Sequence, residues 1–431
     1  MPVRLDRSSA DFAKRFGDFL ATKREASADI EAATRAIVDD VANRGDLALI
    51  EATRKFDRLD LDASRLRVSA GEIDAAVKAC DPATLAALEF ARGRIEGFHR
   101  RQMPKDERFT DPLGVELGWR WTSIESVGLY VPGGTAAYPS SVLMNAVPAK
   151  VAGVGRVVMV VPSPDGKLNP LVLAAAHLSG VSEIYRVGGA QAVSALAHGT
   201  ATIAPVAKIV GPGNAYVAAA KRLVFGKVGI DMIAGPSEVL VIADRTGNSG
   251  WIAADLLAQA EHDLNAQSIL ITDDAALAAD VERAIEAQLA TLPRADIARA
   301  SWNDFGAVIL VKHIADSVAL ANAIAAEHLE IMTADPEALS VQIRNAGAIF
   351  LGAHTPEAIG DYVGGSNHVL PTARSARFSS GLGVLDFMKR TSILKCGPDQ
   401  LRALGPAAMT LGKAEGLDAH ARSVGLRLNL P

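Results

Sequence analysis

The chain has 431 residues, 49% hydrophobic and 22% charged, which is typical of a globular protein of two or three domains. Its formal net charge of −5 gives no electrostatic basis for binding nucleic acid or an anionic membrane. The N-terminal segment carries Asp6, Asp11 and Asp18 and no apolar targeting core, and no apolar run is long enough to span a bilayer, so a cytoplasmic location is expected. Cys80 and Cys396 fit no CxxC pattern.

The N-terminal quarter of the chain predicts helices. Residues 8–57 read as charged amphipathic helices that are interrupted at Gly45. Pro82 suits the first turn of a further helix, which we expect to run to about Gln102. Residues 103–123 are aromatic and rich in turn residues, which indicates a connection with one strand pair.

From residue 127 onwards, short β-branched segments alternate with alanine-rich segments of helical character. The predicted strands are Val127–Val131, Val157–Val161, Ile184–Val187, Ile209–Val210, Val239–Ile242, Ile269–Thr272, Val308–Val311 and Ala348–Leu351. The predicted helices are Ser140–Val154, Leu171–Ser179, Ala190–His198, Ala215–Phe225 and Asp274–Leu289. This alternation predicts an α/β fold with two parallel sheets covered by helices.

We therefore expect two Rossmann-like domains without the usual GxGxxG fingerprint, plus N-terminal helices and a C-terminal helical tail. Residues 1–24 form an N-terminal helical arm in this division. Residues 25–125 with 238–384 form a first, discontinuous domain, and residues 126–237 form the second. The strand signal stops after Leu385, so residues 385–431 read as extended chain plus helix that can reach a partner subunit.

The stretch from Asp231 to Asp263 places polar side chains after a Gly-Pro-Ser turn, a buried strand and a helix. Gln259 and His262 are three residues apart and so share one helical face, where they can bind a cation. We expect them at the strand-to-helix edge where α/β proteins usually bind ligands. Taken alone, the stretch fits the polar face of an amphipathic helix better than a metal site.

Four loops rich in Gly and Pro follow predicted strands, at residues 132–134, 188–191, 211–214 and 235–237. Glycine allows close approach of a ligand to the backbone, and the next helix offers free N–H groups to a phosphate. A nucleotide ligand is therefore favoured, although each loop by itself is equally well explained as an ordinary turn. The pair Gly153 and Gly155 lacks a third glycine and precedes its strand, so it is not a dinucleotide fingerprint.

Acidic and histidine side chains occur together at three further places. Glu327 and His328 are predicted at the end of an alanine-rich helix, where a carboxylate beside an imidazole supplies two bases. The segment 360–368 joins a carboxylate and an imidazole through a Gly-Gly turn, and the segment 415–420 has an acid and a histidine on the tail. Read singly, each fits an ordinary helix end or loop with solvated charges.

Together these stretches resemble the histidinol dehydrogenase family over residues 25–425. The motifs are long: GLYVPGGTAAYPSSVLMNAVPAKVAGV, RVGGAQAVSALAHGT, KIVGPGNAYVAAAK, DMIAGPSEVLVIAD, LLAQAEHD, AEHLEIM, GDYVGGSNHVLPT, ARFSSGLGV and EGLDAHARSV. The resemblance implies an NAD-dependent oxidoreductase of histidine biosynthesis with one Zn²⁺ per subunit. Such an enzyme oxidises L-histidinol to L-histidinal and then to L-histidine, and it uses two NAD⁺ and one water.

The resemblance also assigns individual residues. It implies that zinc is held by Gln259, His262, Asp361 and His420, and that NAD contacts Tyr130, Gln191 and Asn214. The implied substrate contacts are Ser237, His328, His368 and Glu415 together with the zinc ligands. His328 is the implied base for both oxidations, and Glu327 activates the water that hydrates the aldehyde. A homodimer with shared active sites is implied as well, in which Glu415 and His420 complete the partner's site.

Three alternatives remain open at this stage. A paralogous zinc- and NAD-dependent dehydrogenase of another small alcohol, such as a sulfonated diol, is the closest. His368 and Glu415 favour histidinol, because an anionic sulfonate calls for added positive charge. A zinc hydrolase without a redox cofactor is the second, with Glu327 activating water, and a non-catalytic metal-binding protein is the third. The nucleotide-type loops and the Glu327-His328 pair weigh against these two.

Overall fold

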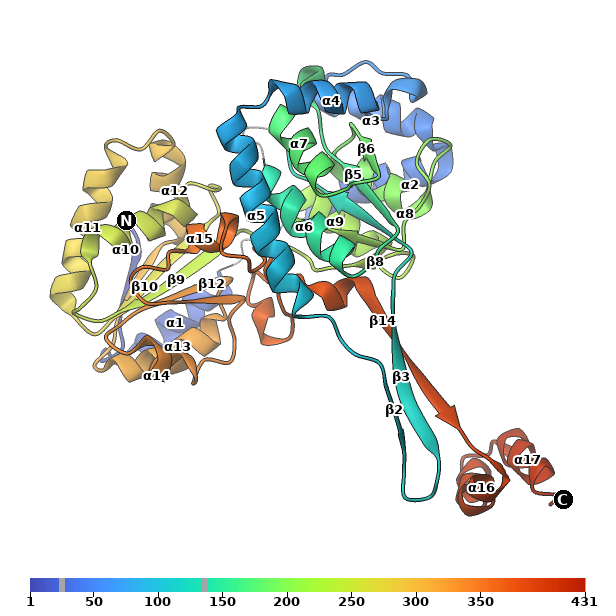
Figure 1. The fold of residues 1–431 in the computed structure, drawn as a ribbon. Helices are drawn as coiled ribbons and strands as arrows, with labels where there is room; N and C mark the ends of the chain where they lie inside the picture. Colours follow the sequence, from blue (N-terminus) through green and yellow to red (C-terminus); the bar gives the residue numbers. More distant parts are fainter. Residues whose placement is uncertain (23–27, 134–137, 431) are drawn as a thin grey trace.

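A computed structural model describes residues 1–22, 28–133 and 138–430, which form two α/β lobes side by side and a long arm (Figure 1). Each lobe contains one parallel sheet with helices on both faces. The predicted α/β class with two parallel sheets is therefore confirmed. No helix in the described ranges is long and apolar enough to cross a membrane.

The first lobe is built on a six-stranded sheet in the order β1-β11-β10-β9-β12-β13, with every neighbouring pair parallel. Its strands are β1 (Val3–Asp6), β9 (Glu238–Ala243), β10 (Gln267–Thr272), β11 (Ala307–Leu310), β12 (His328–Met332) and β13 (Ala348–Leu351). The central strands β9 and β10 are buried on both faces, which explains their continuous apolar sequence.

Helices cover both faces of this sheet. One face packs against α10 (Ser249–Ala260), α11 (Ala275–Leu289) and α12 (Ala295–Phe305). The other face packs against α1 (Phe12–Ala21), α13 (Ser317–Ile324) and α14 (Pro336–Ser340). Alternate residues of β9 enter different cores, since Val239 and Val241 face α10 while Leu240 and Ile242 face α13.

The second lobe is built on a five-stranded parallel sheet in the order β6-β5-β4-β7-β8. Its strands are β4 (Ser126–Tyr130), β5 (Arg156–Val160), β6 (Glu183–Tyr185), β7 (Lys208–Val210) and β8 (Gly229–Ile230). Numbered by appearance within the sheet, this order is 3-2-1-4-5, as in doubly wound nucleotide-binding folds. The chain reverses direction of winding between β4 and β7, and parallel sheets bind ligands at such a point.

Helices from two separate chain segments cover the second sheet. One face packs against α4 (Ala70–Ala79), α5 (Pro82–Arg100), α6 (Pro139–Val151) and α7 (Pro170–Leu178). The other face packs against α2 (Ala28–Arg44), α3 (Asp46–Asp57), α8 (Gly189–His198) and α9 (Ala215–Val224). Figure 1 shows α5 along the boundary between the two lobes.

The arm is an antiparallel sheet of β14 (Met388–Lys395), β3 (Glu116–Ser123) and β2 (Glu107–Thr110). It leads away from both lobes to a helical hairpin of α16 (Pro398–Ala414) and α17 (Asp418–Arg427) (Figure 1). The remaining elements are α15 (Glu357–Tyr362) and short 3-10 turns at Ala63–Arg65, Pro164–Gly166, Ile314–Asp316, Ser375–Arg377 and Val384–Phe387.

All eight predicted strands and the five predicted helices after residue 127 occur, but four other strands were missed or misread: β1, β8, β12 and β14. Residues 1–24, predicted as a helical segment, begin instead with β1, which pairs with β11 at the edge of the six-stranded sheet. His328 begins β12, whereas the alanine-rich pattern predicted that it ends a helix. That prediction was wrong because α13 ends at Ile324 and Ala325 takes a left-handed conformation. The tail contains β14, whose residues are mostly exposed and therefore lack an apolar pattern.

The packing also differs from the expected division of the chain into domains. Helices α2 to α5, expected in the first domain, pack against the five-stranded sheet of the second lobe. The segment around Val369–Phe387 joins the same core, although the first domain was expected to extend to residue 384. Helix periodicity identifies an apolar face but not the sheet that it covers, so these boundaries depended on tertiary contacts.

Candidate active site

Buried acidic and histidine side chains gather where β9 and β12 of the six-stranded sheet begin. His328 is the first residue of β12 and pairs with Val239 of β9 and Ala348 of β13. Glu327 directly precedes it, and Ser237 directly precedes β9. Both Glu327 and His328 are about 5% exposed or less, so the sheet holds them in one orientation away from bulk water.

The imidazole of His328 has a defined orientation. Its Nδ1 lies 3.1 Å from the carbonyl oxygen of Glu238 and therefore donates to it. The neutral ring then carries no proton on Nε2, which has no hydrogen-bond partner among the described residues and lies 3.5 Å from Oδ1 of Asp361. Nε2 of His328 is thus the atom available to take a proton, on the side where Asp361 lies.

Glu327 is fixed by the neighbouring strand. The backbone N–H of Glu238 donates to Oε2 of Glu327 over 3.0 Å, and the same oxygen lies 3.9 Å from Nδ1 of His328. Burial raises the pKa of Glu327 to about 7, in spite of the opposing effects of His328 and this hydrogen bond. A carboxyl group with a pKa near neutrality can both accept and return a proton.

Burial alone lowers the pKa of His328, but the neighbouring carboxylates raise it well above its ordinary value. Glu327 has the largest of these effects, followed by Glu357, whose Oε2 lies 3.7 Å from Nδ1 of the ring. Burial raises the pKa of Asp361, yet the interaction with His328 at 3.5 Å outweighs this effect, and that pKa is lowered. The pair therefore favours an imidazolium beside an ionised Asp361.

Gln259 presents a free ligand atom on the same side, next to His262. The Gln259 amide Nε2 lies 3.1 Å from Nδ1 of His262, and its Oε1 is buried without a hydrogen-bond partner among the described residues. With Nδ1 accepting from this amide, the neutral ring carries its proton on Nε2. Burial lowers the pKa of His262, so the ring is kept neutral as a metal ligand requires.

His368 extends the cluster from the segment after α15. Its Nδ1 lies 3.9 Å from Oδ1 of Asp361, and its Nε2 is buried and unpaired within the described chain. The adjacent Asn367 donates to the carbonyl oxygen of Met144 in α6 over 2.6 Å. His368 is therefore held at a place where the first lobe contacts the second.

The position of the cluster differs from the expected ligand edge. Gln259 and His262 lie at the end of α10, which runs back along the sheet, and they meet the residues that precede β9 and β12. The cluster is thus at the amino-terminal edge of the sheet, whereas a carboxyl-terminal edge was expected. At that other edge, the Asp244 carboxylate already accepts from the backbone N–H groups of Thr246 and Ala334.

Three acids behind His328 were not singled out in the sequence: Asp255, Glu330 and Glu357. Oε1 of Glu330 accepts from the backbone N–H of Glu357 over 2.6 Å, and Asp255 hydrogen-bonds to Glu330. Burial, and then the charges of Asp255 and Glu357, raise the pKa of Glu330 to about 9. Only the alternation of polar and apolar residues in HLEIM signals this cluster, and it does not reveal the partners.

We expect the Glu330→Gln variant to be more stable than wild type, by a margin that grows as the pH rises. The unfolded chain ionises Glu330 near pH 4.5, whereas the folded chain keeps it protonated to about pH 9. Its contribution to stability is therefore full below pH 4.5 and is lost as the pH rises through 9. Denaturant unfolding at pH 5, 7 and 9 should show a growing advantage of the variant, on the order of a few kcal/mol. A constant difference, like that of the exposed Glu337→Gln control, would contradict this assignment.

The three residues predicted to contact a nucleotide lie after strands of the second sheet. Tyr130 ends β4, and its hydroxyl accepts from the backbone N–H of Gly189 over 3.0 Å. Gln191 is buried in the first turn of α8, and Asn214 caps α9 by accepting from Tyr216 N–H over 3.1 Å. All three lie at the carboxyl-terminal edge of the sheet, as ligand contacts in such folds do.

A buried ion pair shapes the loop after β7. Lys221 pairs with Asp231, and both side chains are 2% exposed or less. Lys221 Nζ donates to the carbonyl oxygen of Gly211 over 3.0 Å, and Asp231 Oδ2 accepts from the Gly211 N–H over 2.7 Å. Gly211 has φ +108° and its Cα lies against Tyr130, so no larger residue fits. The pair thereby fixes the loop that leads to Asn214.

The two lobes bring these sites next to each other. Tyr362 of α15 interacts electrostatically with Tyr138, which precedes α6 at the carboxyl-terminal edge of the second sheet. Gly134 of the predicted loop at residues 132–134 lies outside the described residues. The acid and histidine cluster is therefore adjacent to the edge where the nucleotide-type loops gather.

Glu415 and His420 are not part of the cluster within one chain. Glu415 follows α16 and His420 lies in α17, both exposed at the far end of the arm (Figure 1). Among the described residues, no group of three or more His, Cys, Asp or Glu side chains is arranged to hold a metal ion. Gln259 is not of these types, so His262 and Asp361 are the two predicted ligands of these types that remain in the lobe.

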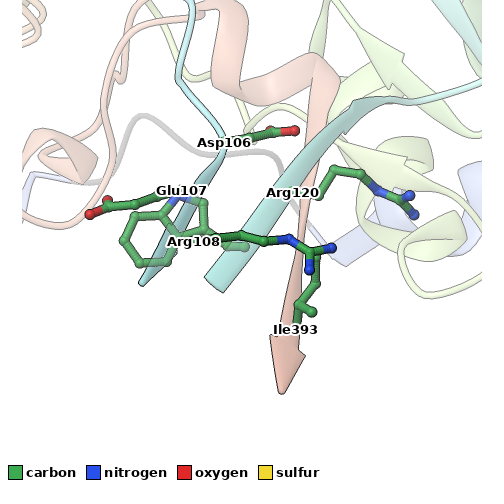
Figure 2. A pocket seen from close by; sticks show the side chains of 6 residues that line it. Asp106, Glu107, Arg108, Arg120 and Ile393 are labelled. Carbon is green, nitrogen blue, oxygen red and sulfur yellow. The ribbon is translucent and has the colours of Figure 1, made fainter. Parts of the chain in front are cut away.

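A pocket of about 170 Å³ lies on the arm (Figure 2). It is lined by Asp106, Glu107, Arg108, Trp119, Arg120 and Ile393. A second pocket of about 380 Å³ lies beside β6 and the start of α4. Neither is lined by a predicted site residue.

Fold and cluster together define the class of this protein: an α/β enzyme with a buried cluster of acidic and histidine side chains beside a nucleotide-type sheet edge. A family model of histidinol dehydrogenase matches residues 20–428. The histidinol dehydrogenase of Bradyrhizobium diazoefficiens is 85% identical over 430 residues, and that of Rhodopseudomonas palustris is 81% identical over 429, each with full coverage of both chains.

The crystal structure of histidinol dehydrogenase from Elizabethkingia anophelis has the same fold. It superposes with a TM-score of 0.94 at 36% identity, over 99% of this chain and 98% of that chain. The chain therefore belongs to the histidinol dehydrogenase family, and it is an oxidoreductase of histidine biosynthesis.

Proposed function

We propose that this chain oxidises L-histidinol through L-histidinal to L-histidine with two molecules of NAD⁺, in an active site that holds one Zn²⁺. The observation that carries the proposal is the oriented Nε2 of His328, which lies 3.5 Å from Oδ1 of Asp361 and has no hydrogen-bond partner among the described residues. Membership of the histidinol dehydrogenase family supplies the substrate and the cofactor. A cytoplasmic location remains a prediction from the N-terminal sequence.

The residues present fit a zinc site that lacks one ligand. The unpaired Oε1 of Gln259 supplies a neutral oxygen, Asp361 supplies an ionised one, and His262 supplies a neutral nitrogen. Zn²⁺ takes such nitrogen and oxygen ligands, and a fourth comes in this proposal from His420 of a second copy. When bound, the ion would orient the substrate and offset the charge of Asp361. Because that charge raises the pKa of His328, offsetting it would lower this pKa towards neutrality.

In the first oxidation, His328 Nε2 takes the hydroxyl proton of histidinol as hydride passes to the nicotinamide. Nδ1 of His328 remains bound to the carbonyl of Glu238, so the ring keeps its orientation as its charge changes. The strand pairing of β12 with β9 and β13 restricts any movement of the backbone at this residue. Ser237 and His368 are the further substrate contacts in this proposal.

The second oxidation requires hydration of the aldehyde, because only the hydrate has another hydride to give. Glu327 is placed beside His328 and has a pKa raised to about 7 by burial, so it can activate the water near neutral pH. His328 then takes the proton of the hydrate as the second hydride leaves. In this proposal Glu327 activates the water and His328 deprotonates the alcohol and the hydrate.

We propose that NAD binds at the carboxyl-terminal edge of the five-stranded sheet, with contacts from Tyr130, Gln191 and Asn214. Tyr130 is already engaged with Gly189, and Asn214 caps α9 through its oxygen, so its amide nitrogen is left for the ligand. We also propose a homodimer in which the partner contributes Glu415 and His420. The arm supports this, because Glu415 ends α16 and His420 lies in α17, and the arm places both helices away from the chain's own lobes (Figure 1).

The decisive experiment follows NADH absorbance to completion with limiting L-histidinol and purified protein. We expect two NADH per histidinol, because both oxidations occur at one site. Treatment with a chelator should abolish the reaction, and added Zn²⁺ should restore it. One NADH per histidinol would contradict the two-step course. No NADH from a zinc-loaded protein would favour a related dehydrogenase of another alcohol or a hydrolase.

A further inference from the structure

A buried carboxylate in the second lobe, Asp57, takes no part in the proposed proton and hydride transfers. Asp57 is the last residue of α3 and is only 7% exposed. A carboxylate at the C-terminus of a helix is disfavoured by the helix dipole, and burial raises the pKa of Asp57. Within the described chain its carboxylate accepts a long hydrogen bond, 3.2 Å, from the backbone N–H of Ser163. An ionised Asp57 carboxylate at this position therefore lowers the stability of the folded chain.

Asp57 lies at the carboxyl-terminal edge of the five-stranded sheet, although its own helix precedes the sheet in sequence. Ser163 follows β5, the second strand of the 3-2-1-4-5 order, and its hydroxyl is fully buried without a partner among the described residues. A Cβ on Gly133 or Gly188 would clash with Pro162, so both glycine loops contact this turn. Asp57 also interacts electrostatically with Tyr130, one of the proposed NAD contacts.

In dinucleotide-binding folds of this order, an acidic residue after the second strand accepts hydrogen bonds from the adenosine ribose. The first acid after β5 is Asp165, but its two oxygens are taken by Arg58 at 2.8 and 2.7 Å. Asp57 instead brings a carboxylate to this place from a separate helix. Arg58 is occupied by Asp165 and is not free to bind a 2′-phosphate.

We propose that Asp57 binds the 2′- and 3′-hydroxyls of the adenosine ribose and thereby selects NAD over NADP. The two hydroxyls supply the donors that the buried carboxylate lacks, and a 2′-phosphate would bring a second negative charge against it. This inference rests on the proposed function, since it assigns a residue to its nucleotide site. It also explains how the lobe recognises a nucleotide without a GxGxxG fingerprint.

The test compares Asp57→Asn with wild type and with Asp60→Asn, an exposed carboxylate three residues away that is paired with Arg54. Asn retains an oxygen that accepts from the Ser163 N–H but loses the charge, so a purely structural role predicts no change in cofactor preference. We expect the ratio of kcat/KM for NADP⁺ over NAD⁺ to rise about tenfold or more in Asp57→Asn. The KM for histidinol and the ratio in Asp60→Asn should remain at wild-type values.

Binding of ADP-ribose and of 2′-phospho-ADP-ribose, measured by calorimetry, tests the same residue without any reaction. Wild type should prefer ADP-ribose, and Asp57→Asn should lose most of that preference. An unchanged ratio in both kinetics and binding, with an intact melting transition, would overturn the assignment of Asp57. A wild-type protein that makes no NADH but binds ADP-ribose with this preference would refute the proposed function and leave the role of Asp57 intact.

Discussion

Replacing Glu327 with Gln is expected to slow the oxidation of histidinal much more than the oxidation of histidinol. Glu327 activates water only in the second half of the reaction, and loss of a general base costs about 10²-fold or more. The first half uses His328, which Gln leaves in place, so a loss of about tenfold or less is expected there. The amide oxygen of Gln can still accept from the Glu238 N–H, the bond that Glu327 makes at 3.0 Å.

The two oxidations are separated by supplying histidinol and histidinal as alternative substrates in single-turnover experiments. With histidinol, the variant should release one NADH per site rapidly and the second slowly. His328→Gln is the matched control, because it removes the base of both steps and should slow them alike. Equal losses in both halves for Glu327→Gln would show that the two residues do not divide the reaction in this way.

Two inactive variants are expected to restore activity to each other when they form a mixed dimer. One variant carries His328→Ala in the lobe and the other His420→Ala on the arm. If each arm completes the partner's site, one site of the mixed dimer combines both substitutions and the other has neither. Such a dimer should show about half of the wild-type activity per dimer, since one of its two sites is intact.

Co-expression with two different affinity tags and sequential purification isolates the mixed dimer. Each variant purified alone should be inactive, and a doubly tagged wild type sets the reference. If His420 served its own chain, both sites of the mixed dimer would be defective and no activity would return. Failure of the two tags to copurify would contradict the dimer itself.

The amino-acid sequence by itself determined the class of fold and most of its elements. Strands such as β9 and β10 are buried on both faces, so their apolar residues form unbroken runs that reveal them. Local patterns failed where the surroundings decide the structure. The alanine-rich residues before His328 suit a helix, yet they lead into a strand because β9 and β13 provide pairing partners on both sides.

The candidate residues were visible in the sequence, but their arrangement was not. Gln259, Asp361 and His328 were indicated by the family motifs, while the acids behind the imidazole were signalled only by the polar and apolar alternation in HLEIM, which does not reveal their partners. Their pKa values depend on burial and on mutual charge, as Glu330 and Glu357 demonstrate with pKa values raised to about 9 and about 8. Such effects arise from distances between segments that are remote in sequence.

Tertiary structure alone decided which edge of the sheet carries the chemistry. Sequence spacing places Gln259 and His262 on one helical face but gives no direction for that face relative to the strands. Because α10 runs antiparallel to β9, its end returns to the amino-terminal edge, beside His328. Tertiary structure also decided the position of Asp57. Its helix is far from β5 in sequence, and only folding brings Asp57 to Ser163 at the carboxyl end of β5. The sequence determines which side chains are present, and packing determines which of them meet.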